Sequence, residues 1–135
     1  MKNQAFSSLL FITYRLFTLK QTVMNHKELE KSKVYVISQI VEYISNSVIS
    51  RTILGKLTGA INVLAFDDEE GLPEKISPFD TVIQIIEGKA EIIIDGASYF
   101  VEEGECIIIP AHQPNSIKGN KRFKMILTII KSGYE

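Results

Sequence analysis

The 135-residue chain contains no tryptophan, one cysteine and two histidines, and each scarcity removes a class of protein or site. Because Cys106 is the single thiol, no disulfide can form within the chain, which fits a reducing compartment. The formal net charge is −1, so the composition gives no electrostatic reason to bind nucleic acid. We therefore expect a cytoplasmic protein without a nucleic-acid partner.

The N-terminal stretch lacks the uninterrupted apolar run of a membrane-spanning helix. Such a helix needs about 20 apolar residues, and Arg15 interrupts this stretch near its middle. No small-residue cleavage pattern follows it, so a secretory signal is not indicated. We interpret residues 1–32 as an N-terminal arm, in which residues 1–23 are an extension from an upstream start codon or a loosely attached segment. We expect no membrane partner.

What the chain does contain is a series of short runs rich in β-branched residues, separated by turn residues. The Glu87-Gly88-Lys89 turn predicts a hairpin between two of these runs. The charged stretch that contains Asp67 and Pro73 is expected to be a loop. The predicted strands cover residues 33–44, 48–55, 60–66, 81–86, 90–94, 98–101, 106–109, 116–118 and 123–130.

Regular short strands with tight turns predict an all-β sandwich or barrel that occupies residues 33–135. Two runs, Ile92–Ile94 and Ile107–Ile109, are apolar at every position rather than at alternate positions. Strands of this kind are covered on both faces, so we expect the barrel to pack against a second subunit as a homodimer. Cys106 lies in such a run and is expected to be a buried, inert side chain.

Several turn residues and one longer motif stand at a characteristic spacing: Gly71, Glu87-Gly88, Asp95-Gly96 and the segment GECIIIPAHQPNSI from Gly104 to Ile117. This spacing resembles that of the cupin superfamily, and more narrowly that of small single-domain cupins of the cupin 2 conserved barrel type. The resemblance covers residues 33–132. It implies a double-stranded β-helix, also called an RmlC-like jelly roll, that is usually a homodimer.

Cupins usually hold a metal through two histidines and a glutamate in a first motif and a third histidine in a second motif. Aligned on Gly88 and Pro110, the four ligand positions fall on Lys75, Ser77, Thr81 and Asn115. None of these is a good ligand for a divalent transition metal. The resemblance therefore implies a barrel without metal or other cofactor.

The two histidines do not restore such a site. His112 stands where the family usually has a small residue, and His26 lies in the N-terminal arm, far along the chain from the barrel. A metal site built from His26, His112 and Glu74 is conceivable only on paper. A pairing of Cys106 with His112 is equally unsupported.

Six polar residues are expected on or beside an apolar barrel lining, which is the usual composition of a small-ligand site. Lys75 could pair with a carboxylate or phosphate of such a ligand. In the alternative interpretation these residues point to solvent or bond local backbone. The candidate ligand-binding residues are Lys75, Ser77, Thr81, Gln84, His112 and Asn115.

Three functional hypotheses follow. The first is a metal-free cupin-like barrel that binds a small organic ligand or acts as a sensor-like module. The second is a metal-dependent oxygenase or isomerase with substituted ligands. The third is a metal-independent enzyme in which Lys75 or His112 is an acid–base group. The replaced ligand positions favour the first.

Overall fold

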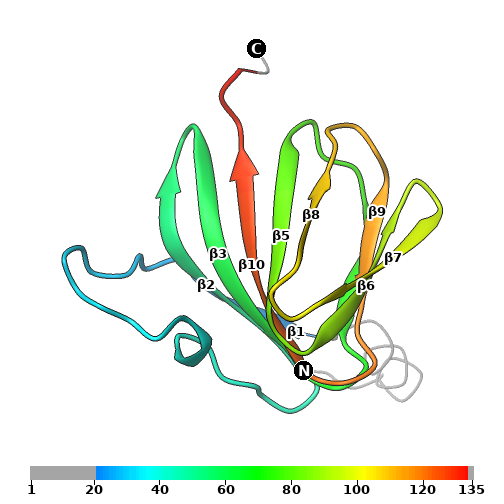
Figure 1. The fold of residues 1–135 in the computed structure, drawn as a ribbon. Helices are drawn as coiled ribbons and strands as arrows, with labels where there is room; N and C mark the ends of the chain where they lie inside the picture. Colours follow the sequence, from blue (N-terminus) through cyan, green and yellow to red (C-terminus); the bar gives the residue numbers. More distant parts are fainter. Residues whose placement is uncertain (1–20, 134–135) are drawn as a thin grey trace, which may run out of the picture.

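The computed structural model describes residues 21–133, and within them the chain forms ten β-strands in two sheets (Figure 1). All pairings are antiparallel except that between β1 and β2. The larger sheet has the order β1 (Gln21–Asn25), β2 (Ser47–Lys56), β3 (Gly59–Phe66), β10 (Phe123–Ile130), β5 (Asp80–Glu87) and β8 (Cys106–Ile109). The smaller sheet has the order β4 (Gly71–Lys75), β9 (Asn115–Lys118), β6 (Lys89–Ile94) and β7 (Ala97–Glu102). The predicted all-β jelly roll is confirmed.

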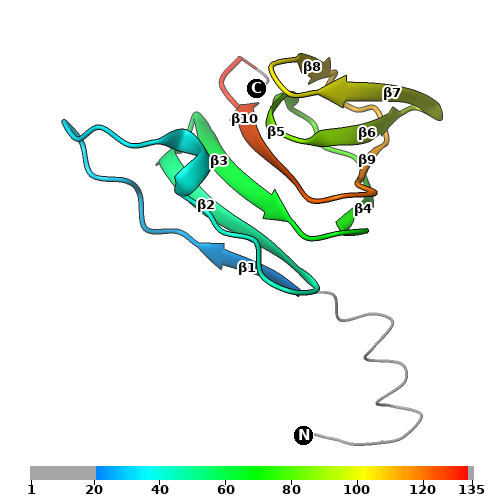
Figure 2. The same ribbon diagram turned by 60° about the horizontal axis from the view of Figure 1, so that its bottom comes forward.

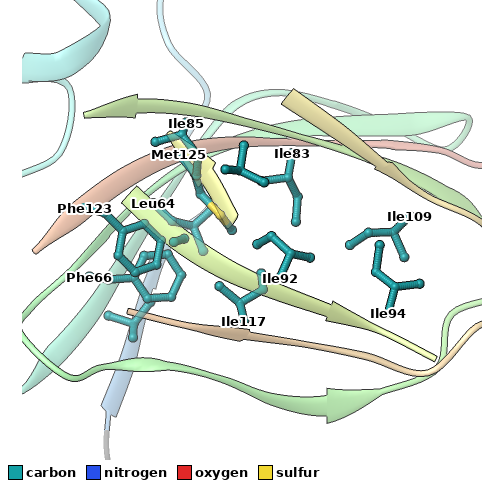
Figure 3. Packing of buried hydrophobic residues seen from close by; sticks show 13 residues of the cluster. Leu64, Phe66, Ile83, Ile85, Ile92, Ile94, Ile109, Ile117, Phe123 and Met125 are labelled. Carbon is teal, nitrogen blue, oxygen red and sulfur yellow. The ribbon is translucent and has the colours of Figure 1, made fainter. Parts of the chain in front are cut away.

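The two sheets face each other and bury one apolar core between them (Figure 3). Alternation along the strands produces it: Ile83 and Ile85 point inward from β5, whereas Gln84 between them is exposed. Each buried branched side chain stabilises the fold by about 1.5–3 kcal/mol. The core residues labelled in Figure 3 are Leu64, Phe66, Ile83, Ile85, Ile92, Ile94, Ile109, Ile117, Phe123 and Met125.

The two ends of this interior differ. At one end, which we call the closed end, the rings of Phe66 and Phe123 stack with their centroids 4.2 Å apart and their planes 8° from parallel. Both rings are fully buried. At the other end, which we call the open end, Ile94 and Ile109 approach each other from opposite sheets (Figure 3). The neighbours of these two isoleucines are polar, and they form the candidate site described below.

The prediction of a strand at residues 33–44 is wrong. This segment is irregular apart from a short 3-10 helix, η1 (Ile37–Gln39). The segment runs along the outer face of the larger sheet (Figure 2) rather than pairing with a strand. Val41 is buried there with Val63 and Ala65. Four other apolar residues of the segment are exposed: Val34, Val36, Ile37 and Ile44. The β-branched composition therefore does not indicate a strand here, and only part of the segment packs against the sheet.

Tyr43 fastens this covering segment to the sheet. Its hydroxyl donates a hydrogen bond of 2.8 Å to Glu87 Oε2, and burial together with the Glu87 carboxylate raises the pKa of the phenol. The Lys124 ammonium lies 4.8 Å from the centroid of the Tyr43 ring and donates to the Ser38 carbonyl at 2.6 Å. These contacts hold the segment where it shields the outer face of β3 and β10.

An ion pair joins two distant parts of the chain next to the stacked phenylalanines. Arg122 Nε lies 2.8 Å from Asp67 Oδ1, and the Asn46 N–H donates to Asp67 Oδ2 at 2.7 Å. The Arg122 guanidinium and the Asn46 N–H lower the pKa of Asp67 to about 2. Since Asp67 follows Phe66 and Arg122 precedes Phe123, the pair links the two strands that carry the rings.

The predicted hairpin over residues 81–94 is also wrong in its pairing, although both strands exist. β5 pairs with β10 and β8, whereas β6 pairs with β7 and β9 in the other sheet. Gly88, with a φ of 82°, carries the chain from one sheet to the other, and a side chain there would meet the Arg122 carbonyl oxygen. The expected charged loop is confirmed at residues 67–70, whereas its second part, which contains Pro73, forms β4.

Part of the expected N-terminal arm joins the barrel. Residues 1–20, which contain most of the proposed upstream extension, lie outside the described residues, but Gln21–Asn25 forms β1 beside β2. The two isoleucine runs are only partly covered within one chain, because Ile93 is half-buried and Ile108 is 61% exposed. Cover for Ile108 by a second subunit stays a prediction.

Candidate functional site

Two buried polar side chains lie at the open end, one on each sheet. Thr81, which is 8% exposed, is the cross-strand partner of Ile109 on β8. Asn115, which is 4% exposed, is the partner of Ile94 on β6. Ile109 and Ile94 adjoin across the interior (Figure 3). Their cross-strand partners Thr81 and Asn115 therefore border the same end of the barrel. The expectation that these positions share a region of the barrel therefore agrees with the geometry.

Lys75 and Asn115 form the centre of this end. The Lys75 ammonium donates to Asn115 Oδ1 at 3.2 Å, and Asn115 Nδ2 donates back to the carbonyls of Lys75 at 3.3 Å and Gln113 at 3.1 Å. The amide is thus fixed in orientation. Although Lys75 is exposed as a whole residue, desolvation lowers the pKa of its ammonium. Among residues 21–133 no carboxylate forms an ion pair with it.

Ser77 and His112 connect the two loops that flank this end. The Ser77 carbonyl accepts a 2.7 Å hydrogen bond from the His112 N–H, and the Ser77 hydroxyl oxygen accepts one of 3.2 Å from the Phe79 N–H. His112 has a φ of 70°, and its side chain is exposed. The backbone of His112, rather than its imidazole, makes the contact with Ser77.

Gln84 lies elsewhere, on the outer face of β5. Its cross-strand partner is Cys106, and both residues line a surface hollow of about 370 Å³ with Ile37 and Glu105. Cys106 is exposed, so the expectation of a buried thiol is wrong. Gln84 is three residues from the inward-facing Thr81, which places it on the opposite face of a strand with a two-residue period.

Nothing in the sequence is a reason to place His26 beside the barrel, because it lies far along the chain, but in the structure it lines a cleft of the barrel. His26 directly follows β1 and lies in a cleft of about 670 Å³. The wall of this cleft includes Ile129, the cross-strand partner of Thr81. Glu28 holds this part of the chain against the barrel, because its Oε2 accepts the Gly55 N–H at 2.9 Å. No local pattern in the sequence signals the parallel pairing of β1 with β2 that places His26 there. The polar residues of the cleft are His26, Glu28, Thr52, Lys56, Asn62 and Lys131.

The donor groups at the open end do not fit a divalent metal. An ammonium has no free electron pair, hydroxyl oxygens are weak neutral ligands, and the Asn115 oxygen already accepts from Lys75. Within the described part of the chain, no three histidine, cysteine, aspartate or glutamate side chains gather in a way that could hold an ion. We therefore assign no metal-dependent step to these residues.

The fold and this site define a jelly-roll barrel whose open end presents a lysine and an amide in place of metal ligands. No family model and no curated protein matches the chain. Solved structures do. A conserved protein of unknown function from Streptococcus pyogenes is 31% identical, with a TM-score of 0.74, over 78% of this chain and 92% of the other.

A cupin superfamily protein from Desulfitobacterium hafniense is 26% identical, with a TM-score of 0.72, over 77% of this chain and 95% of the other. A cupin 2 conserved barrel domain protein from Leptotrichia buccalis is 25% identical, with a TM-score of 0.67, over 70% of this chain and 46% of the other. The chain belongs to the cupin superfamily. None of its described residues forms a helix long and apolar enough to cross a bilayer.

Proposed function

We propose that this cupin-like barrel binds a small organic anion at its open end without a metal, as a binding or sensor-like module. The observation that carries the proposal is the Lys75 ammonium. It is desolvated and hydrogen-bonded to a fixed amide, and it has no carboxylate partner among the described residues. A desolvated charge without a counter-charge is unfavourable, and an anionic ligand would relieve it.

The surroundings of Lys75 support this choice of ligand. A lysine carries three N–H donors, and the hydrogen bond to Asn115 uses one of them, so donors remain for a carboxylate or phosphate oxygen. Ile94 and Ile109 supply apolar wall nearby, and Thr81 adds a hydroxyl. Mostly apolar walls with a few placed polar groups are typical of small-molecule sites.

An enzymatic role has less support. A metal-dependent oxygenase or isomerase needs ligands that Lys75, Ser77, Thr81 and Asn115 do not supply. An acid–base enzyme would need a substrate within reach of Lys75 or His112, and the His112 side chain is exposed while only its backbone contacts Ser77. A binding role needs only the groups already gathered at the open end.

NMR titration with acetate, benzoate and inorganic phosphate tests the proposal. We expect saturable shifts at the amides of Thr81 and Asn115, and a rise in the pKa of Lys75, followed at its Cε, when an anion is bound. The Lys75→Met variant should bind at least about tenfold more weakly, since it loses a charge-assisted hydrogen bond. The Lys31→Met variant, altered at an exposed lysine outside the site, should bind normally.

Three results would reject the proposal. One is the absence of saturable shifts at the open end with all three anions. Another is one equivalent of iron, nickel, manganese or zinc in protein purified without chelator. The last is a chemical conversion of a probe that Lys75→Met or His112→Ala abolishes, because that would indicate an enzyme.

The proposal includes a cytoplasmic homodimer. Ile108 is 61% exposed on β8, which forms an edge of the larger sheet and pairs with β5 alone. An exposed branched side chain on an unpaired edge is suited to cover by a second copy. A molar mass near twice the 15.2 kDa of the chain in light scattering is the expected result. A monomeric mass at micromolar concentration would contradict it.

A further inference from the structure

A second cleft lies on the outside of the smaller sheet, away from the barrel interior. It has a volume of about 530 Å³ and lies beside the turns that precede β6 and β10. Glu91 and Lys118 reach it from the two middle strands of the sheet, and Phe100 reaches it from the edge strand β7. Lys121 and Arg122 reach it from the turn that precedes β10. It shares no lining residue with the His26 cleft, and it contains none of the six candidate ligand-binding residues.

The charge of this cleft is strongly positive although the chain as a whole has a net charge of −1. Four cationic side chains line it, Lys89, Lys118, Lys121 and Arg122, against one acidic side chain, Glu91. Arg122 is paired with Asp67. The three lysines form no ion pair with any residue between 21 and 133.

Glu91 does not neutralise the lysines fully. Its Oε2 accepts a 2.6 Å hydrogen bond from the Ser98 hydroxyl, which holds the carboxylate toward β7. Lys118 is opposite Glu91 in the strand register, but the two charged groups are not within ion-pair distance. The cleft therefore offers unpaired ammonium groups to an anion.

An aromatic ring lies beside these charges. Phe100 is 65% exposed on β7 and is the cross-strand partner of Glu91, so its ring lies on the outer face with the lysines. Contact with water does not stabilise an exposed phenylalanine ring on a sheet, whereas a planar ligand ring can stack on it. A ring platform next to lysines that carry free charge fits a ligand with a planar ring and a phosphate.

We propose that this cleft binds a ligand of the mononucleotide class, with the base stacked on Phe100 and the phosphate held by Lys118 and Lys121. The volume of about 530 Å³ lies in the usual range for small-ligand sites, roughly 300–1,000 Å³. A single aromatic ring and one cluster of lysines suit one nucleotide. A polynucleotide would require a longer positive track.

Isothermal titration of the full chain with AMP, ribose 5-phosphate, adenosine and inorganic phosphate tests this inference. We expect AMP to bind more tightly than adenosine, ribose 5-phosphate or inorganic phosphate. Phe100→Ala should weaken AMP binding by roughly tenfold and leave ribose 5-phosphate unchanged, because base stacking is lost. Lys118→Gln and Lys121→Gln should weaken both phosphorylated probes.

Three control variants separate this site from other surfaces and from the open end. Tyr99→Ala alters the adjacent residue on the other face of β7, and Lys31→Gln removes an exposed lysine elsewhere; both should bind AMP normally. Lys75→Met should also bind AMP normally, so failure of the open-end proposal would not affect this one. All variants are compared only after their circular dichroism and unfolding midpoints match those of the original chain.

Three outcomes would overturn the inference. If AMP at millimolar concentration produces neither a heat of binding nor shifts of the amides near Phe100, the site is excluded. Equal affinities for AMP and inorganic phosphate would mean that Phe100 contributes nothing and the cleft is only a positive patch. Tighter binding of a single-stranded oligonucleotide than of AMP would assign the surface to a polymer.

Discussion

The closed and open ends of the barrel interior are built from the same strands yet differ in chemistry. On β5, Ile83 and Ile85 face the packed core, whereas Thr81, two residues earlier on the same face, borders the open end. On β9, Ile117 is in the core and Asn115 contacts Lys75. One step of the strand period thus separates a buried apolar position from a buried polar one. The comparison teaches that the apolar packing and the polar groups of the proposed site are divided along the length of the barrel.

The largest effect is expected from truncation of the closed-end stack. Phe66→Ala should lower the free energy of unfolding by about 3–5 kcal/mol, because it removes a fully buried ring and leaves a cavity beside Phe123. Phe100→Ala is the matched control. The same change at this exposed ring should cost less than about 1 kcal/mol. Urea unfolding of both variants measures the difference, and equal losses would contradict the conclusion that the buried stack is the main source of stability at the closed end.

The sequence predicts the strands well and their pairing poorly, for a physical reason. Alternating and β-branched runs reveal β2, β3 and β10 nearly to the residue, because side-chain burial is a local property. Pairing is not local. A tight glycine turn usually joins two partners in one sheet, but at Gly88 the chain crosses to the opposite sheet. The segment 33–44 has the composition of a strand, yet most of its β-branched side chains are exposed and Val41 alone is buried against the sheet.

The candidate site, like the fold, could be predicted only in part from the sequence. The resemblance to cupins, aligned on Gly88 and Pro110, implies that positions 75, 77, 81 and 115 lie together, and the structure joins Lys75 to Asn115 by a hydrogen bond. The face of Gln84 follows from the two-residue period and was available from the sequence. The position of His26 could not be predicted from the sequence, since it depends on the pairing of β1 with β2, about 25 residues further along the chain.

A smaller effect, but a more specific one, is expected from adding a single methyl group at each end. A Cβ at Gly119 would lie 2.6 Å from Phe123 Cδ1 and closer still to Cε1, and the stacked ring has no room to move. Gly119→Ala should therefore cost about 1–3 kcal/mol. At Gly55, on the open side, a Cβ would lie 3.5 Å from the Thr52 methyl group, which is ordinary contact, so Gly55→Ala should change stability by less than about 0.5 kcal/mol.

Thermal and urea unfolding of the two alanine variants decide the point, because neither glycine has a positive φ and the change is otherwise the same. If the Gly55 variant lost as much stability as the Gly119 variant, the open side would be as tightly packed as the closed end. If only the Gly119 variant is destabilised, the tightest packing lies at the stacked rings, and β2 near Gly55 has room for an added methyl group.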